Sequence, residues 1–204
     1  MPEPTMNRPS GRHGPARPDG GADAASEADF GRFADLLDPP VYVVTVAGPR
    51  GREPSGCLVG FASQCSISPP RFMVWLSVVN HTYRVALSSS YLAVHVLDRG
   101  QLALAELFGH QTGDTTDKFD QVAWRPCGPE RTPVLDDAAA WFLGRVREHR
   151  PAGDHVGFLL DLTGEGSVPS EPPVPSGPSG PAASGGTPLL SYDDVRHLRP
   201  GHPA

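Results

Sequence analysis

Several features that define other classes of protein are scarce or missing in this 204-residue sequence. The three cysteines, Cys57, Cys65 and Cys127, form no C-x-x-C pair, so neither a disulfide framework nor a zinc site is expected, and no metal is predicted. No apolar run approaches the roughly 18 residues of a membrane span, and the first residues contain no apolar signal core. These absences predict no membrane association and a cytoplasmic location.

Positive charge is also scarce. The sequence has 17 Lys and Arg residues against 23 Asp and Glu residues, with a formal net charge of −6. Because nucleic acids and anionic membranes are bound by clustered cations, the sequence predicts neither as a partner. A small anionic ligand needs only a few local donors and is compatible with this composition.

Glycine and proline are plentiful, with 23 and 24 residues, and they concentrate in two segments. Residues 1–25 contain few large apolar side chains and are predicted to be a disordered tail. Residues 164–188 are mostly Pro, Ser and Gly and are predicted to be a disordered insertion. The remaining residues suit one domain over 26–198 that contains this insertion, followed by a short tail at 199–204.

Extended stretches rich in β-branched and aromatic residues recur along the predicted domain. Strands are predicted over 41–47, 57–63, 72–78, 91–97, 139–147, 155–161 and 188–192. Short helices are predicted over 26–37, 80–87 and 101–108. Six or seven strands with two or three short helices indicate a mainly β, antiparallel barrel. The polar connection 109–134 is long enough to be functional or mobile.

The window 56–70 is unusual for a strand because small and hydroxyl residues replace bulky ones over its middle. Strands use glycine where another backbone or a ligand comes close. The residues alone leave two interpretations open. The window is the binding surface of a planar ligand, or it is a barrel strand that turns a tight corner.

The order of motifs around this window resembles the flavin reductase-like family, whose members are split barrels that carry FMN or FAD. The resemblance rests on S-x-x-S-x-x-P-P at 63–70, N-H-T at 80–82, A-V-H-V-L at 93–97, D-K-F at 117–119 and G-D-H at 153–155. It implies a six- to seven-stranded antiparallel split β-barrel that binds FMN or FAD and takes NADH or NADPH as the hydride donor.

The resemblance also implies which residues bind the cofactor. They are Gly60, Ser63, Gln64, Cys65, Ser66, Asn80, Thr82 and Lys118. The corner at 63–66 supplies consecutive amides and hydroxyls, and the helix that opens at 80–82 supplies free N–H groups for a phosphate. Asn80 and Thr82 also suit ordinary helix capping, and Lys118 and Arg84 also suit solvated surface cations.

His155 is the predicted catalytic residue, because relatives place the histidine of G-D-H near the flavin and an imidazole can donate a proton as the flavin is reduced. From the residues alone, His155 reads as a histidine that begins a strand after a turn. His95 alternates with Val94 and Val96 and reads as a core or outward-facing strand residue.

The sequence departs from the family at Leu58 and Gly60, where many relatives carry hydroxyl residues, so fewer side-chain contacts to the flavin are expected. No G-x-G-x-x-G motif follows a strand, so both nucleotides would share one site. The resemblance implies a homodimeric NAD(P)H:flavin oxidoreductase that supplies reduced flavin to a partner monooxygenase. The alternatives are an FMN-binding electron-transfer module without nicotinamide activity, favoured by the S-Q-x-S variant, and a structural barrel that has lost its flavin.

Overall fold

The computed structural model describes residues 24–48, 53–168 and 188–199, and the chain forms two units, 1–37 and 38–204. In the first unit, helix α1 (Ala24–Ala34) confirms the predicted helix and begins two residues earlier. Its Phe30 and Phe33 rings lie 6.2 Å apart, and both are exposed. None of the described helices is long and apolar enough to cross a membrane. Most of the predicted tail, 1–23, lies outside the described residues.

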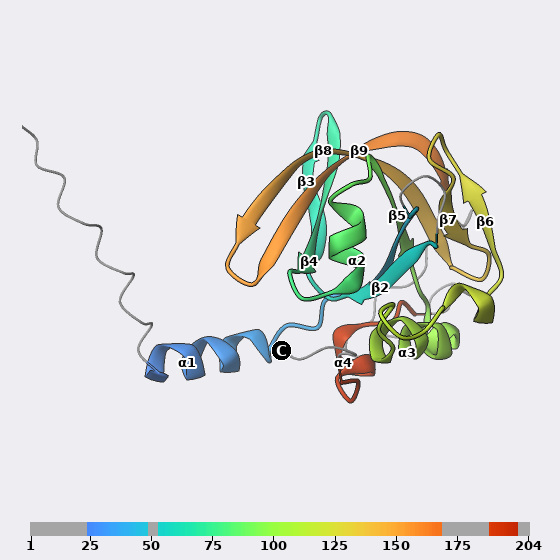
Figure 1. Ribbon diagram of the computed structural model, residues 1–204. Helices are drawn as coiled ribbons and strands as arrows, with labels where there is room; N and C mark the ends of the chain where they lie inside the picture. Colours follow the sequence, from blue (N-terminus) through green and yellow to red (C-terminus); the bar gives the residue numbers. More distant parts are fainter. Residues whose placement is uncertain (1–23, 49–52, 169–187, 200–204) are drawn as a thin grey trace, which may run out of the picture. The chain divides into compact units, whose positions relative to one another are not determined.

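A seven-stranded sheet forms the framework of the second unit, with the order β2-β1-β5-β8-β9-β4-β3 and every neighbouring pair antiparallel. Its strands are β1 (Tyr42–Val46), β2 (Ser55–Val59), β3 (Ala62–Ile67), β4 (Pro70–Ser77), β5 (Tyr91–Val96), β8 (Ala140–Ala152) and β9 (His155–Ser167). The two edge strands, β2 and β3, are consecutive in the chain, so the sheet has to curl until its edges come together (Figure 1). This confirms the predicted mainly β, antiparallel split barrel.

Gly60 and Phe61 form the corner between the two edge strands. The sequence predicted one continuous strand over 57–63, and the structure instead breaks it at this corner. The Trp75 amide of β4 donates to the Phe61 carbonyl (2.9 Å), which extends the pairing of β3 and β4 to the corner. A glycine suits a sharp change of strand direction because it brings no side chain to the bend.

The two largest apolar clusters occupy the two faces of the sheet. Val44 of β1 faces the barrel interior with Phe158 of β9, whereas Val43 faces the opposite side. Successive side chains of a strand point to opposite faces, so β1 is buried on both. Helix α2 (His81–Ala86) packs on the interior cluster, and α3 (Leu102–His110), which follows the 3-10 turn η2 (Arg99–Gln101), packs on the other.

The connection 109–134 contains regular structure that the sequence did not predict. It holds the 3-10 turn η3 (Phe119–Gln121) and then β6 (Trp124–Cys127), which pairs with β7 (Thr132–Leu135). Both strands have only four residues, and each contains a proline, which removes a backbone donor. The strand signal was therefore too short and too interrupted to read.

The C-terminal part of the fold differs from the prediction at two points. Strand β9 continues through 164–167, into the segment that was predicted as an insertion, and 169–187 lies outside the described residues. The predicted strand over 188–192 is reduced to the isolated bridges of Leu189 with Asp98 and of Ser191 with Pro40. Helix α4 (Tyr192–Val195) follows and packs near α3 (Figure 1).

Candidate functional site

A cavity of about 400 Å³ opens beside the corner between β2 and β3. Its size is that of a small-molecule site, and its walls are mostly apolar. Five parts of the chain meet around it: the end of β2, the end of β4, the loop after α3, the turn between β8 and β9, and α4. Of the predicted site residues it brings together Gly60, Asn80, Lys118 and His155.

Gly60 gives one wall of the cavity a flat surface. A Cβ atom added at Gly60 would meet only the ring of Tyr192, whose nearest atom lies 3.5 Å away. The neighbouring Phe61 side chain is 60% exposed and lines the same cavity. Bare backbone beside two aromatic rings is a surface against which a planar heterocycle can lie.

His155 begins β9 directly after the β8–β9 turn, where Gly153 adopts a φ of +66°. Its Nδ1 atom lies 2.8 Å from Oδ1 of Asp154, and this contact lowers the pKa of the Asp154 carboxyl. The His155 ring packs 5.3 Å from the ring of Phe61 and is 26% exposed. Asp154 engages Nδ1, whereas Nε2 has no hydrogen-bond partner among the described residues. The Nε2 atom can therefore contact a ligand.

Lys118 is buried, with 4% of its surface exposed, so it is not the solvated surface cation that its sequence alone allows. Its Nζ donates to the carbonyls of Gln111 (2.8 Å) and Phe108 (3.4 Å) at the end of α3. Burial lowers the pKa of Lys118. Carbonyls at a helix C-terminus stabilise a cation, but within the described residues no carboxylate pairs with this ammonium group. A phosphate in the cavity would balance its charge.

Asn80 and Thr82 both serve the start of α2. The Asn80 side chain accepts from the Thr82 amide (2.8 Å), which is ordinary capping, and Asn80 also lines the cavity. Thr82 is 1% exposed, does not line the cavity, and shares a hydrogen bond of 2.9 Å with the hydroxyl of Ser55. Cys57 beside them is buried, which raises the pKa of its thiol and keeps it protonated at neutral pH.

The four other predicted cofactor residues lie on the edge strand β3, away from this cavity. They are Ser63, Gln64, Cys65 and Ser66. Most of β3 is exposed, its register with β4 shifts between Gln64 and Ser66, and Gln64 Nε2 donates to the Ser66 carbonyl (3.0 Å). Within one chain, the structure therefore does not bring these four residues to Lys118 and His155.

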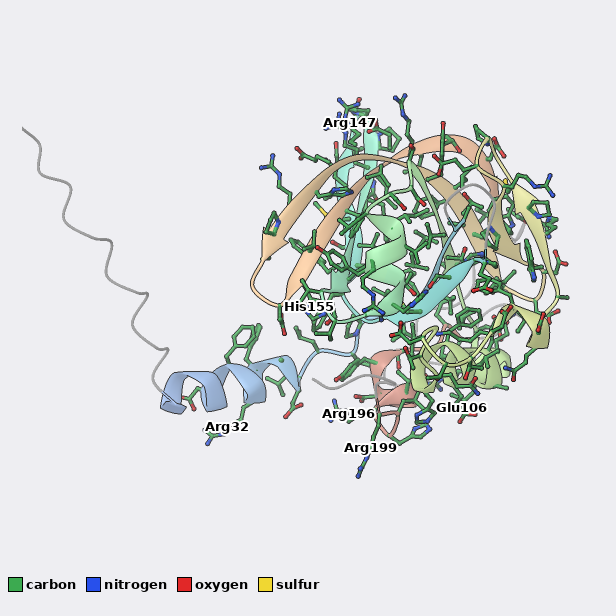
Figure 2. The ribbon with its side chains drawn as sticks, viewed as in Figure 1. Arg32, Glu106, Arg147, His155, Arg196 and Arg199 are labelled. Atoms are coloured by element: carbon green, nitrogen blue, oxygen red, sulfur yellow. The ribbon has the colours of Figure 1, made fainter. Side chains whose placement is uncertain are left out.

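Residues that the sequence did not single out complete the cavity. Phe61 comes from the corner, while Tyr192 and Arg196 come from the C-terminal segment. Figure 2 shows His155 toward the end of the barrel that carries Arg196, whereas Arg147 lies at the opposite end. The Arg196 guanidinium lies 5.8 Å from the centre of the Tyr192 ring. No sequence signal links these residues to Gly60, because their proximity arises only when the barrel closes.

A comparison with known protein families identifies the family to which this chain belongs. The model of the flavin reductase like domain matches residues 35–176, well over half of the sequence. The protein belongs to this family, and the predicted resemblance is confirmed. The match ends before 188–199, so Tyr192 and Arg196 lie beyond the matched residues.

Curated relatives carry the names of flavin reductases. The chain is 32% identical over 134 residues to a probable flavin reductase of Rhizobium meliloti, covering 66% of this chain but only 40% of the relative. It is 32% identical over 142 residues to the FMN reductase (NADH) RutF of Variovorax paradoxus, covering 68% and 74%. It is 28% identical over 137 residues to the 4-hydroxyphenylacetate 3-monooxygenase reductase component of Escherichia coli, covering 64% and 78%.

A solved structure has the same fold. The NADH:FAD oxidoreductase SgcE6 of Streptomyces globisporus matches with a TM-score of 0.62 and 26% identity, covering 74% of this chain and 87% of that one. The names of the relatives agree with the predicted class of NAD(P)H:flavin oxidoreductase and with flavin and NADH as its cofactors.

Proposed function

We propose that the protein transfers hydride from NADH or NADPH to FMN or FAD bound in the cavity of about 400 Å³ beside Gly60. The observation that carries this proposal is the convergence of Gly60, Asn80, Lys118 and His155 on one cavity in a flavin reductase-like chain. Family membership supplies the reaction class, and the cavity gives that reaction a place in this molecule.

The residues present suit a flavin nucleotide. An isoalloxazine ring is wide and apolar, and the walls formed by Leu58, Phe61 and Trp75 are apolar or aromatic. A ribityl phosphate is anionic, and the buried Lys118 ammonium lies in the same lining without a carboxylate partner in the described chain. Leu58 and Gly60 offer no hydroxyl, so ring contacts would come from backbone groups and we expect modest flavin affinity.

The flavin supplies the hydride acceptor, and the protein supplies position and electrostatics. Gly60 leaves one wall free of side chain, so a ring can approach the backbone closely. Lys118 fixes the anionic arm of a nucleotide. The apolar walls exclude water, which protects a reduced product from side reactions.

His155 is the proposed proton donor. The Asp154 carboxylate accepts the Nδ1–H of the imidazole, which orients the ring. In the imidazolium form, Nε2 carries a second proton that can be transferred to a bound ligand, and Phe61 packs against the ring. A proton delivered from Nε2 would neutralise charge that develops as the bound heterocycle accepts hydride.

A partner monooxygenase is part of the proposal, supported by the relative named as the reductase component of such an enzyme. We also propose a homodimer. The predicted cofactor residues Ser63 to Ser66 are mostly exposed on an edge strand and do not line the cavity of their own chain. A second copy packed against β3 would allow these residues to contribute to a shared site.

The test is a steady-state assay of the purified protein under air, with FMN or FAD combined with NADH or NADPH and oxidation followed at the nicotinamide absorbance. The expected result is turnover above the non-enzymatic rate with at least one pair. Omitting free flavin distinguishes a flavin substrate from a bound cofactor. No turnover with any of the four pairs, from folded protein, contradicts the proposal, and retained yellow colour without response to nicotinamide would select the electron-transfer module.

A further inference from the structure

The segment 188–199 forms one wall of the cavity, although it lies beyond the residues that match the family. It contributes Tyr192, Val195, Arg196 and Leu198 to the lining. The segment meets the barrel at Gly60, where Cδ2 and Cε2 of Tyr192 lie 3.5 and 3.8 Å from the position that a Cβ atom would occupy. The family match therefore accounts for the other walls of the cavity but not for this one.

The backbone that carries Tyr192 is already fixed without a ligand. Ser191 is buried, and its amide donates to Oδ2 of Asp194 (3.0 Å) in the capping box that begins α4. Nε of Arg99 donates to the same oxygen (3.1 Å). The Val195 side chain is buried in the apolar cluster beneath the segment. Because these contacts order the segment, little conformational entropy is lost when Tyr192 meets a ligand.

The Tyr192 side chain has few contacts of its own with the fold. It is 41% exposed, although it lines a cavity. The Arg196 guanidinium packs near its ring, and the phenol hydroxyl makes no hydrogen bond to any residue that the structure describes. An aromatic ring in this position buries more of its surface when a planar ligand enters. The ring, and not the hydroxyl, is therefore the part of Tyr192 that a ligand would use.

We propose that Tyr192 is a flavin-binding residue, whose aromatic side chain packs against the isoalloxazine ring bound beside Gly60. The inference rests on the proposed function, because it requires the flavin in this cavity. Gly60 has no side chain, so a heterocycle that lies on its backbone reaches the Tyr192 ring. Aromatic rings attract one another in offset and edge-to-face arrangements. Tyr192 then adds affinity for the ring, whereas Lys118 adds affinity for the phosphate arm.

Titrations of the full chain with lumiflavin, riboflavin and FMN, followed by flavin fluorescence, test the inference. Lumiflavin carries the isoalloxazine ring without the ribityl arm. Tyr192→Ala should weaken all three ligands by the same factor, about tenfold. Tyr192→Phe keeps the aromatic ring and should bind all three within about twofold of the wild type. His197→Ala, at an exposed position of the same segment that does not line the cavity, should change none of the affinities.

The outcomes separate this inference from the proposed function. If Tyr192→Ala binds the three flavins as the wild type does, the inference is overturned and flavin binding stands. A loss for FMN without a loss for lumiflavin overturns it as well, because the contact would then be with the arm. A higher KM for NADH with unchanged flavin affinities would assign Tyr192 to the nicotinamide and overturn the flavin contact.

A structural role of Tyr192 is distinguished by thermal denaturation of the same variants. If Tyr192→Ala lowers the melting temperature and Tyr192→Phe fails to restore flavin affinity, the side chain acts through the segment and the inference is overturned. Unchanged melting temperatures together with the common loss of affinity in Tyr192→Ala support the direct contact. A wild type that binds none of the three flavins overturns the proposed function and this inference together.

Discussion

Two histidines contrast the buried interior of the fold with the mouth of the cavity. His95 lies on β5 with none of its surface exposed, and both ring nitrogens have backbone partners: Nδ1 lies 2.9 Å from the Val43 carbonyl, and Nε2 accepts from the Leu135 amide (3.1 Å). His155 lies at the mouth of a cavity and uses only Nδ1 for the protein.

The contrast teaches that position on a strand does not decide whether a histidine is available to a ligand. Burial lowers the pKa of His95 to about 4, so His95 is neutral at physiological pH and joins β1, β5 and β7. Since it has no atom left for a ligand, its role is structural. His155 has a free nitrogen, an orienting carboxylate and access to a cavity, which are the requirements of a general acid.

The largest effect is expected from His95→Ala. The substitution removes two buried hydrogen bonds and leaves the Leu135 amide without the acceptor that the ring provides, so the free energy of unfolding should fall by about 4 kcal/mol. Urea denaturation followed by circular dichroism measures it. His197→Ala, at an exposed position after α4, serves as the control. A loss below about 1 kcal/mol would show that the two histidines differ less than their contacts indicate.

The pH dependence of stability should report the same site. His95 titrates near 4 in the folded chain and near 6.5 when unfolded, so folding favours its neutral form. Its contribution is complete above pH 6.5 and is lost as the pH falls toward 4, by about 3 kcal/mol in total. Denaturation curves across this range, for the wild type and His95→Gln, isolate the effect, because other groups titrate in both proteins. Parallel curves would contradict the assignment.

His155→Ala should leave stability nearly unchanged and lower the turnover of hydride transfer by about 100-fold, with flavin affinity preserved. The substitution at the cavity mouth would then lower activity and spare stability, whereas the substitution of the buried His95 lowers stability. Stopped-flow measurement of flavin reduction separates this step from binding. Unchanged turnover would remove His155 from the mechanism, and an equal loss of flavin affinity would make it a binding residue.

The smallest effect concerns Thr82. Thr82→Val keeps its shape and removes the bond to Ser55, so the free energy of unfolding should fall by about 1 kcal/mol. Because Thr82 does not line the cavity, FMN and riboflavin should weaken to the same small extent. Calorimetry with both ligands decides the point. A loss of affinity confined to FMN would show that Thr82 contributes to phosphate binding, as its motif predicted.

The fold could be predicted where local patterns are long. The β-branched runs that became β1, β4 and β5 and the cap at Asn80 all carry strong local signals. The strands β6 and β7 could not be predicted, since each has only four residues with a proline among them. The unusual composition around Gly60 was visible in the sequence, but only the closure of the sheet shows that the chain turns a corner there.

The site could be predicted in part. Motif order pointed to Gly60, Asn80, Lys118 and His155, and the structure brings these four to one cavity. Tyr192 could not be foreseen, because it reaches Gly60 from 132 positions along the chain and no local pattern encodes that contact. The residues of β3 show the opposite limit: a motif fixes their order along the chain but not whether they face their own cavity or a neighbouring copy.

The way in which the segment 188–199 is attached has a practical consequence. Four backbone hydrogen bonds link it to the body of the barrel: Pro188 accepts from Arg99, Leu190 both donates to Leu97 and accepts from Val41, and Tyr192 donates to Pro39. Val195 adds a buried apolar anchor. A single protease cut between 168 and 188 would therefore produce two fragments that stay associated, and the nicked protein could be split and reassembled as a complementation pair.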